Sequence, residues 1–170
     1  MAVIPAVVTD DARQFWPQMF GGLIPFKLIS EFKVGEGGWI DPGGGPTPRT
    51  PVGSLRRLDN GIQDIDAVVD PTRILANQRY AAAERASFTK ALAASDFSFV
   101  SPTKVEVRCF LDLADFNDDG FGNSPNIYEI AVFSEHPTLV GQKLKLAYGT
   151  FPLQVKTSGI SILNVVRIIF

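Results

Sequence analysis

The sequence predicts an α+β protein whose C-terminal half is mainly antiparallel β-sheet or sandwich. A short N-terminal helix, a long Gly/Pro-rich arm and a central segment with both helical and strand character come before it. Residues 104–113 alternate between apolar and polar side chains, which is the period of a half-buried strand. Residues 127–133 are apolar on both faces except for Glu129, which is typical of an interior strand. A polar connection rich in Gly and Asn lies between them, so we expect these two strands to pair and to organise the fold.

The composition is that of one globular domain spanning residues 1–170. Hydrophobic residues make up 45% of the chain and charged residues 20%, which excludes a disordered or membrane class. The net charge of −2 gives no electrostatic basis for binding nucleic acid or an anionic membrane. The longest apolar runs are too short to span a bilayer, and residues 1–8 lack the basic start of a signal peptide. We therefore expect synthesis in a cytoplasm and no membrane insertion.

The N-terminal helix is predicted to begin after Thr9, whose hydroxyl is a suitable cap. Asp10 and Asp11 then lie at the positive end of the helix dipole, where acidic residues are favourable. Pro17 is expected to limit this helix, because proline removes a backbone hydrogen bond and clashes with the preceding turn. We place the end of the helix by Gly21.

Residues 26–34 alternate well enough for a strand, and an arm over residues 35–53 follows with seven Gly and four Pro. This composition is incompatible with a helix or a central strand, and the arm lacks the lysine and the spacing of phosphate-binding loops. Trp39 in this arm is either folded onto its own domain or an anchor in a neighbouring protein. The arm residues that we take as candidate partner contacts are Trp39, Ile40, Pro42, Pro46 and Pro48.

The segment over residues 54–97 has weaker preferences. Residues 54–70 contain a turn signal and a short candidate strand. Over residues 73–97 the alanines favour a helix by propensity, whereas the aromatic and hydroxyl residues near the end suit a strand, and both alternatives stay open. Residues 144–151 and 161–170 are two further strands, so the second half is expected to form an antiparallel sheet of four or more strands.

The connection after the first central strand matches the opening of a calcium loop. It offers oxygen ligands at Asp115, Asn117 and Asp119, followed by Gly120, which permits a sharp turn. The twelfth position is Asn126 rather than a bidentate Glu, and the flanking segments are strands rather than helices. The same residue types suit any tight connection, so a structural turn is the first interpretation and a calcium site the second.

No catalytic motif can be recognised in the sequence. His136 is the only histidine, so a metal cluster of several histidines cannot form, and we expect neither enzymatic activity nor a cofactor. Cys109, the only cysteine, falls at an inward strand position and is expected to be a small buried hydrophobe. Glu129 is predicted to be a buried structural charge, paired with Arg108 or Lys145 on neighbouring strands.

The order of the short motifs is also informative. The segment VVTDDAR is followed by the turn VGEG at residues 34–37, the strand EIAVF at 129–133 and the strand YGTFP at 148–152. This order resembles the N-terminal domain of phage tail-collar and tail-fibre proteins, which has a T-D-x-G start, a VGdG turn, an EIGLF strand and a Y-x-x-x-P strand. The chain departs from that pattern at Ala12 and Ala131, where the family has glycine.

The resemblance implies a structural virion protein of the tail or baseplate, which attaches a fibre or completes a baseplate through contacts with baseplate wedge or tail fibre proteins. Family members usually continue into a receptor-binding shaft, which this sequence does not show. We therefore expect an adaptor within a symmetric multi-subunit assembly. The alternative is a calcium-assisted carbohydrate-binding module built on Asp115, Asn117 and Asp119. A hydrolase of cell-wall polymers is a third hypothesis, for which the sequence offers no motif.

Overall fold

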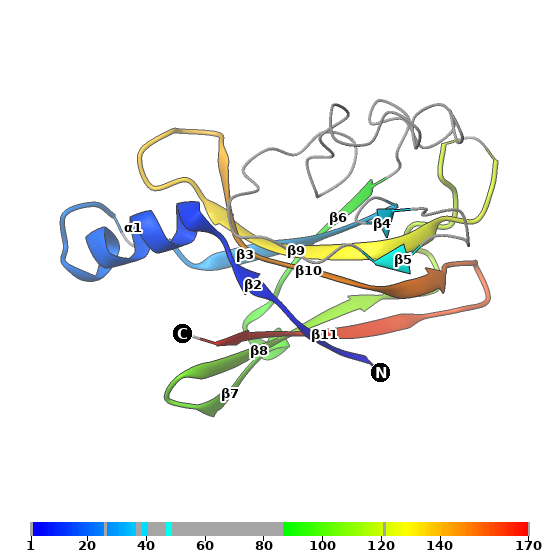
Figure 1. Ribbon diagram of the computed structural model, residues 1–170. Coiled ribbons are helices and arrows are strands. Elements are labelled where there is room, and N and C mark those ends of the chain that lie inside the picture. The colour runs from blue at the N-terminus through cyan, green and yellow to red at the C-terminus, as the bar shows by residue number, and fades with distance from the viewer. Residues whose placement is uncertain are drawn as a thin grey trace.

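Two β-sheets pack face to face in the computed structural model, which describes residues 2–25, 27–36, 39–40, 47–48, 87–120 and 122–169 (Figure 1). The first sheet has the strand order β1 (Ala2–Pro5), β11 (Ile162–Ile169), β8 (Lys104–Leu111) and β7 (Phe97–Ser101). The second sheet has the order β2 (Val7–Val8), β10 (Lys143–Val155), β9 (Asn126–Glu135), β3 (Ile29–Gly35) and β6 (Ser87–Ala91). The fold is α+β, as the sequence predicts.

The predicted pairing of the two central strands is wrong. Strand β8 lies in the first sheet between β11 and β7, whereas β9 lies in the second sheet between β10 and β3. The buried side chains of Val107 on β8 and of Ile130 and Val132 on β9 belong to the same core cluster. The apolar faces of the two strands therefore meet across the sandwich. If β8 and β9 paired within one sheet, these faces would lie on the same side of that sheet and could not pack against each other. Residues Ile127 to Ser134 are all buried, which confirms that β9 is an interior strand.

The N-terminal helix α1 (Asp10–Phe20) has Thr9 as its N-cap, as predicted, and it ends at Gly21. The expectation that Pro17 limits the helix is wrong, because Pro17 lies inside α1. Proline at this position removes a hydrogen bond to the carbonyl of Arg13. Both residues are exposed, so water can hydrogen-bond to that carbonyl and the helix continues for another three residues.

Residues 2–8 form strands that the sequence analysis missed. Strand β1 pairs with β11 in parallel, which is the only parallel pair among the described strands. The amide of Ala6 then donates to the carbonyl of Arg167 at 3.2 Å, and β2 pairs with β10 in the second sheet. This short segment therefore joins both sheets before α1 begins.

The described part of the central segment is extended rather than helical. Residues 87–97 form β6, the 3₁₀ turn η3 (Ala94–Asp96) and the start of β7, so the strand alternative is correct for them. Residues 54–86 lie outside the described residues. Strand β6 is the edge of the second sheet and β7 is the edge of the first, so η3 carries the chain from one sheet to the other. No helix in the described ranges is long and apolar enough to cross a membrane.

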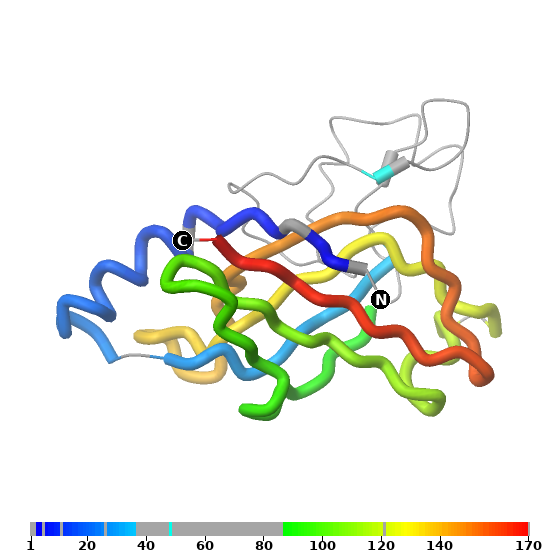
Figure 2. The backbone as a smooth tube through the Cα atoms, turned by 90° about the horizontal axis from the view of Figure 1, so that it is seen from below, coloured from blue at the N-terminus to red at the C-terminus, as the bar shows by residue number. Residues whose placement is uncertain are grey.

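Helix α1 and the β7–β8 hairpin lie at the same end of the sandwich (Figures 1 and 2). The loop that follows β8, coloured yellow-green, lies at the opposite end. The two ends are candidate sites for different reasons, because the loop carries the predicted calcium ligands and the α1 end carries exposed apolar side chains.

Candidate functional site

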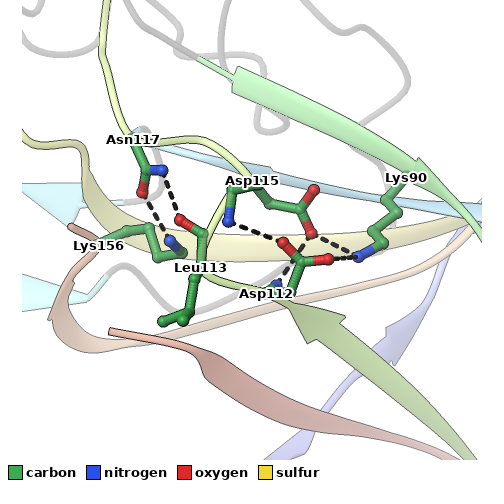
Figure 3. Close-up of polar contacts among 7 residues, drawn as sticks. Lys90, Asp112, Leu113, Asp115, Asn117 and Lys156 are labelled. Atoms are coloured by element: carbon green, nitrogen blue, oxygen red, sulfur yellow. Dashed lines mark hydrogen bonds and ion pairs between the residues drawn. The ribbon is translucent and has the colours of Figure 1, made fainter. Parts of the chain in front are cut away.

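Asp115, the first predicted calcium ligand, faces the ammonium group of a lysine. Its Oδ2 accepts hydrogen bonds from Lys90 Nζ and from the amide of Asp112, the latter at 3.0 Å (Figure 3). Lys90 Nζ also lies 3.4 Å from Oδ2 of Asp112. Lys90 comes from β6 of the second sheet, so this ion-paired group joins the loop to that sheet.

Asn117, the second predicted ligand, faces a different lysine. Its Oδ1 accepts a hydrogen bond from Lys156 Nζ at 2.7 Å, and its Nδ2 donates to the carbonyl of Leu113 at 2.6 Å (Figure 3). Lys156 Nζ also donates to the carbonyl of Thr157 at 2.9 Å, and the whole side chain of Lys156 is buried. A buried ammonium group needs such oxygen partners, because burial without them is strongly unfavourable.

Phe116, between these two residues, anchors the loop in the core. Its backbone has φ of 46°, a left-handed conformation that is uncommon for a bulky residue. Its side chain is buried and stacks on Phe88 of β6, with ring centres 5.7 Å apart. Burial of this aromatic ring compensates for the unfavourable backbone conformation, as expected where surrounding packing determines a strained residue.

Asp119, the third predicted ligand, is engaged within the loop. Its Oδ1 accepts from the amide of Asn123 at 3.1 Å, and its own amide donates to the Asn123 carbonyl at 3.0 Å. Gly120 has φ of 86°, which confirms the predicted sharp turn at this glycine. The oxygen atoms of the three predicted ligands are therefore oriented by three different partners, namely Lys90, Lys156 and Asn123.

A calcium ion in this loop would compete with two lysine ammonium groups for the oxygens of Asp115 and Asn117. Among the described residues, no three His, Cys, Asp or Glu side chains lie together as a group that could hold a metal. Neither Lys90 nor Lys156 is near the loop in sequence, which is why the sequence analysis missed both. The geometry favours the structural interpretation of the loop.

The two lysines differ in their electrostatics. For Lys156, burial lowers the pKa, and the attraction of Asp115 and Asp112 offsets this only in part. For Lys90, burial also acts to lower the pKa, but hydrogen bonds and attraction from Asp115 and Asp112 outweigh it and raise the pKa. The pKa of Asp112 is lowered, chiefly by the hydrogen bond from the Ala114 amide and further by Lys90.

The predicted partner-binding arm is described only in part. Strands β4 (Trp39–Ile40) and β5 (Thr47–Pro48) pair antiparallel, and β5 lies against β10. Pro48 is exposed, whereas Pro42 and Pro46 lie outside the described residues.

Glu129 is fully buried on β9, as the sequence predicts. The hydroxyl of Tyr148 donates to its Oε2 at 3.5 Å. Burial lowers the pKa of Lys33, and attraction by Glu129 opposes this shift. Arg108 is not a partner, because it lies on β8 in the other sheet and is exposed. Lys145, the other predicted partner, is buried on β10 with its Nζ 5.6 Å from the ring centre of Tyr148.

His136 and Cys109, the single histidine and the single cysteine of the sequence, both have structural contacts. Nδ1 of His136 accepts hydrogen bonds from the amides of Thr138 and Leu139 at 3.2 and 3.1 Å, so the ring caps the turn after β9. The same ring contacts Phe15 of α1, with ring centres 4.9 Å apart. Cys109 is buried as predicted, and burial raises the pKa of its thiol far above the usual range.

Four large apolar side chains are exposed at the end of the sandwich formed by α1, the segment after it and β7. Their exposed fractions are 72% for Phe20, 78% for Leu23, 75% for Leu28 and 84% for Phe99. We call these four residues the apolar end. Sequence analysis did not identify them, because periodicity alone does not show which apolar residues of an element are exposed.

No protein-family model matches the chain, and comparison with curated proteins and with solved structures finds no significant match. The resemblance to tail-collar and tail-fibre proteins rests on the sequence motifs alone and enters below as part of a proposal.

Proposed function

We propose that this protein is a structural component of a phage tail and acts as a baseplate or fibre-attachment adaptor through protein–protein contacts. The order of its sequence motifs supports this proposal, and the apolar end is the structural observation that carries it. The partners are other tail proteins within a symmetric assembly, and the location is the virion. The proposal assigns no catalysis and no cofactor to the chain, and turnover of purified cell-wall material by the protein would contradict it.

Three residues of the apolar end, Phe20, Leu28 and Phe99, line one groove, so they are neighbours rather than scattered surface residues. With about three quarters of each side chain exposed, the four residues present roughly 400 Å² of apolar surface. Contiguous apolar patches of roughly 300–600 Å² are the largest found on typical monomers and are often functional. An interaction surface is therefore the simplest role for this end.

The test is the size of the purified chain by light scattering, alone and mixed with the tail proteins encoded alongside it. The adaptor proposal predicts a folded monomer or small oligomer that joins a defined larger complex. Replacing Trp39 by Ala should leave the fold intact and weaken this complex, because the arm is expected to contact a neighbour. A chain that ignores every tail component, or a Trp39→Ala variant that no longer folds, would count against the proposal.

The carbohydrate-binding alternative keeps one observation in its favour, which is the left-handed Gly120 after three oxygen-bearing residues. It predicts a higher melting temperature in calcium than in chelator, because a ligand bound by the native state stabilises that state. At a calcium concentration of about 100 times Kd, the stabilisation would be about 2.7 kcal/mol. We expect no change, because Lys90 and Lys156 already engage Asp115 and Asn117.

A further inference from the structure

We propose that the apolar end receives an extended segment of a tail partner, which adds as a strand beside β7 and inserts alternate apolar side chains into a groove. The proposed segment also carries an acidic residue that pairs with Lys27. This inference rests on the adaptor function and specifies the surface and the chemistry of the partner.

The groove lies between α1 and the ends of the two sheets and has a volume of about 490 Å³. Helix α1 contributes Trp16 and Phe20, the second sheet contributes Ile29 and Leu146, and the first sheet contributes Phe97 and Phe99. Trp16, Ile29 and Phe97 also pack against the main core, so the groove is continuous with the interior of the sandwich. Apolar side chains entering it would extend the existing core.

Strand β7 provides a backbone edge beside this groove. It is the last strand of the first sheet, and among the described strands it pairs only with β8. Phe97 and Phe99 are opposite Val107 and Val105, respectively, so both phenyl rings lie on the inner face of the sheet. A strand added to β7 would present every second side chain to that same face, which is how edge strands bind extended peptides.

The size of the surface favours an extended segment over a second globular copy. The exposed apolar area of roughly 400 Å² is about half of the roughly 800 Å² that each partner contributes to a standard interface. The surface is also concave, so a flat globular face would not reach the half-buried Ile29 and the buried Leu146 that line it. A single strand reaches them with its side chains.

Lys27 gives the partner a charge preference. Among the described residues it is the only charged side chain that lines the groove, and it has no ion pair with any of them. An acidic residue in the added segment would neutralise this cation as the segment covers it. The partner chemistry is therefore alternating apolar residues with one Asp or Glu.

The experiment uses the full chain and synthetic peptides of about twelve residues, which overlap to cover the tail proteins encoded alongside it and residues 49–86 of this chain. Binding is measured by fluorescence polarisation, and hydrogen exchange reports the amides of residues 97–101. Phe99→Asp places a charge in the groove and Lys27→Glu reverses the charge at its rim. Val140→Asp is the matched control, because Val140 is a fully exposed apolar residue in the turn between β9 and β10.

We expect acidic, alternating peptides from a tail protein to bind and to protect the β7 amides. Phe99→Asp should weaken this binding about tenfold or more, because an unpaired charge is unfavourable in an apolar groove. Lys27→Glu should weaken the binding of acidic peptides and strengthen the binding of peptide variants in which the acidic residue is replaced by Lys. Val140→Asp should leave the binding of both kinds of peptide unchanged. Phe99 is 84% exposed, so Phe99→Asp should fold, as its urea unfolding curve would show.

Each of the following results would overturn the inference. Tail-protein peptides that do not bind, or that bind Phe99→Asp equally well, would exclude this groove. Binding only by peptides from residues 49–86 would show that the chain covers its own groove, and a dimer abolished by Phe99→Asp would assign the surface to a second copy. A tail complex that survives Phe99→Asp would refute the groove while keeping the adaptor function, whereas no tail complex for the unmodified chain would refute the adaptor function itself.

Discussion

The hydroxyl group of Thr9 helps to attach α1 to the second sheet, so replacing Thr9 by Val is a sharp test of this attachment. Oγ1 of Thr9 accepts the amide of Ala12 at 3.2 Å and donates to the carbonyl of Lys145 on β10. The amide of Thr9 donates to the carbonyl of Leu146 at 3.0 Å. Thr9 thus caps the helix and fastens it to the second sheet, and its side chain is buried. Valine keeps the shape and removes both side-chain bonds.

The expected loss combines two contributions. Removing an N-cap hydroxyl costs about 1–2 kcal/mol, and the lost hydrogen bond to the Lys145 carbonyl adds about 1 kcal/mol. The total of about 2–3 kcal/mol should lower the melting temperature by about 4–12 °C in a chain of this size. Thr9→Ser is the control, because it keeps both bonds and loses one methyl group, worth about 0.8 kcal/mol.

Urea unfolding of the wild type and both variants, followed by far-UV circular dichroism, measures these differences. Hydrogen exchange at Ala12 should accelerate in Thr9→Val and stay slow in Thr9→Ser, since only the former loses the acceptor of that amide. A Thr9→Val variant as stable as Thr9→Ser would refute the reasoning, because it would show that the two side-chain hydrogen bonds of Thr9 do not contribute to holding α1.

Two further predictions concern polar pairs that join distant segments. Lys90→Met should destabilise the protein by about 1 kcal/mol at pH 7, because it removes the cation between Asp112 and Asp115. The pKa of Asp112 lies below its usual 3.8 in the folded state. The stability that the ionised Asp112 carboxylate contributes is therefore present above pH 3.8 and is lost as the pH falls through the folded pKa. The difference between wild type and Lys90→Met should therefore shrink in urea titrations at acid pH, and an undiminished difference would contradict the ion pair. Asn164→Leu should cost about 1–3 kcal/mol, because Asn164 and Gln154 exchange two hydrogen bonds of 3.0 Å between the sheets. Adding Gln154→Leu should recover part of that loss, and a double variant that only sums two losses would show that the pair is not coupled.

Local patterns predicted much of the secondary structure. The alternation of residues 104–111 identified β8 and its inward face, and the apolar residues 127–133 identified the interior strand β9. The hydroxyl of Thr9 correctly marked the start of α1. These features depend on side-chain periodicity and capping, which are properties of neighbouring residues and can therefore be read locally.

Features that depend on tertiary context could not be predicted. The sequence does not show whether β8 and β9 pair in one sheet or pack face to face in two sheets. That choice depends on which other strands cover their apolar faces, and no local pattern contains this information. The partners of Asp115 and Asn117 could not be predicted for the same reason. Lys90 and Lys156 reach the loop from segments that are distant in sequence. Pro17 stays within α1 because the position is exposed, which propensity alone does not show.

At one end of the sandwich the polar side chains have partners within the chain, whereas at the other end apolar side chains are exposed. This contrast is the basis for placing the proposed interaction. At the loop end, the carboxylate of Asp115 and the amide of Asn117 obtain cationic partners from the same chain. At the apolar end, Phe99 and Leu28 remain mostly exposed although an apolar groove lies directly beside them. Burial of exposed apolar area is the main favourable term in protein association, whereas ion pairs already formed within the chain offer little to a partner. A binding partner therefore gains more at the apolar end than at the loop, which is why we place the adaptor interaction there.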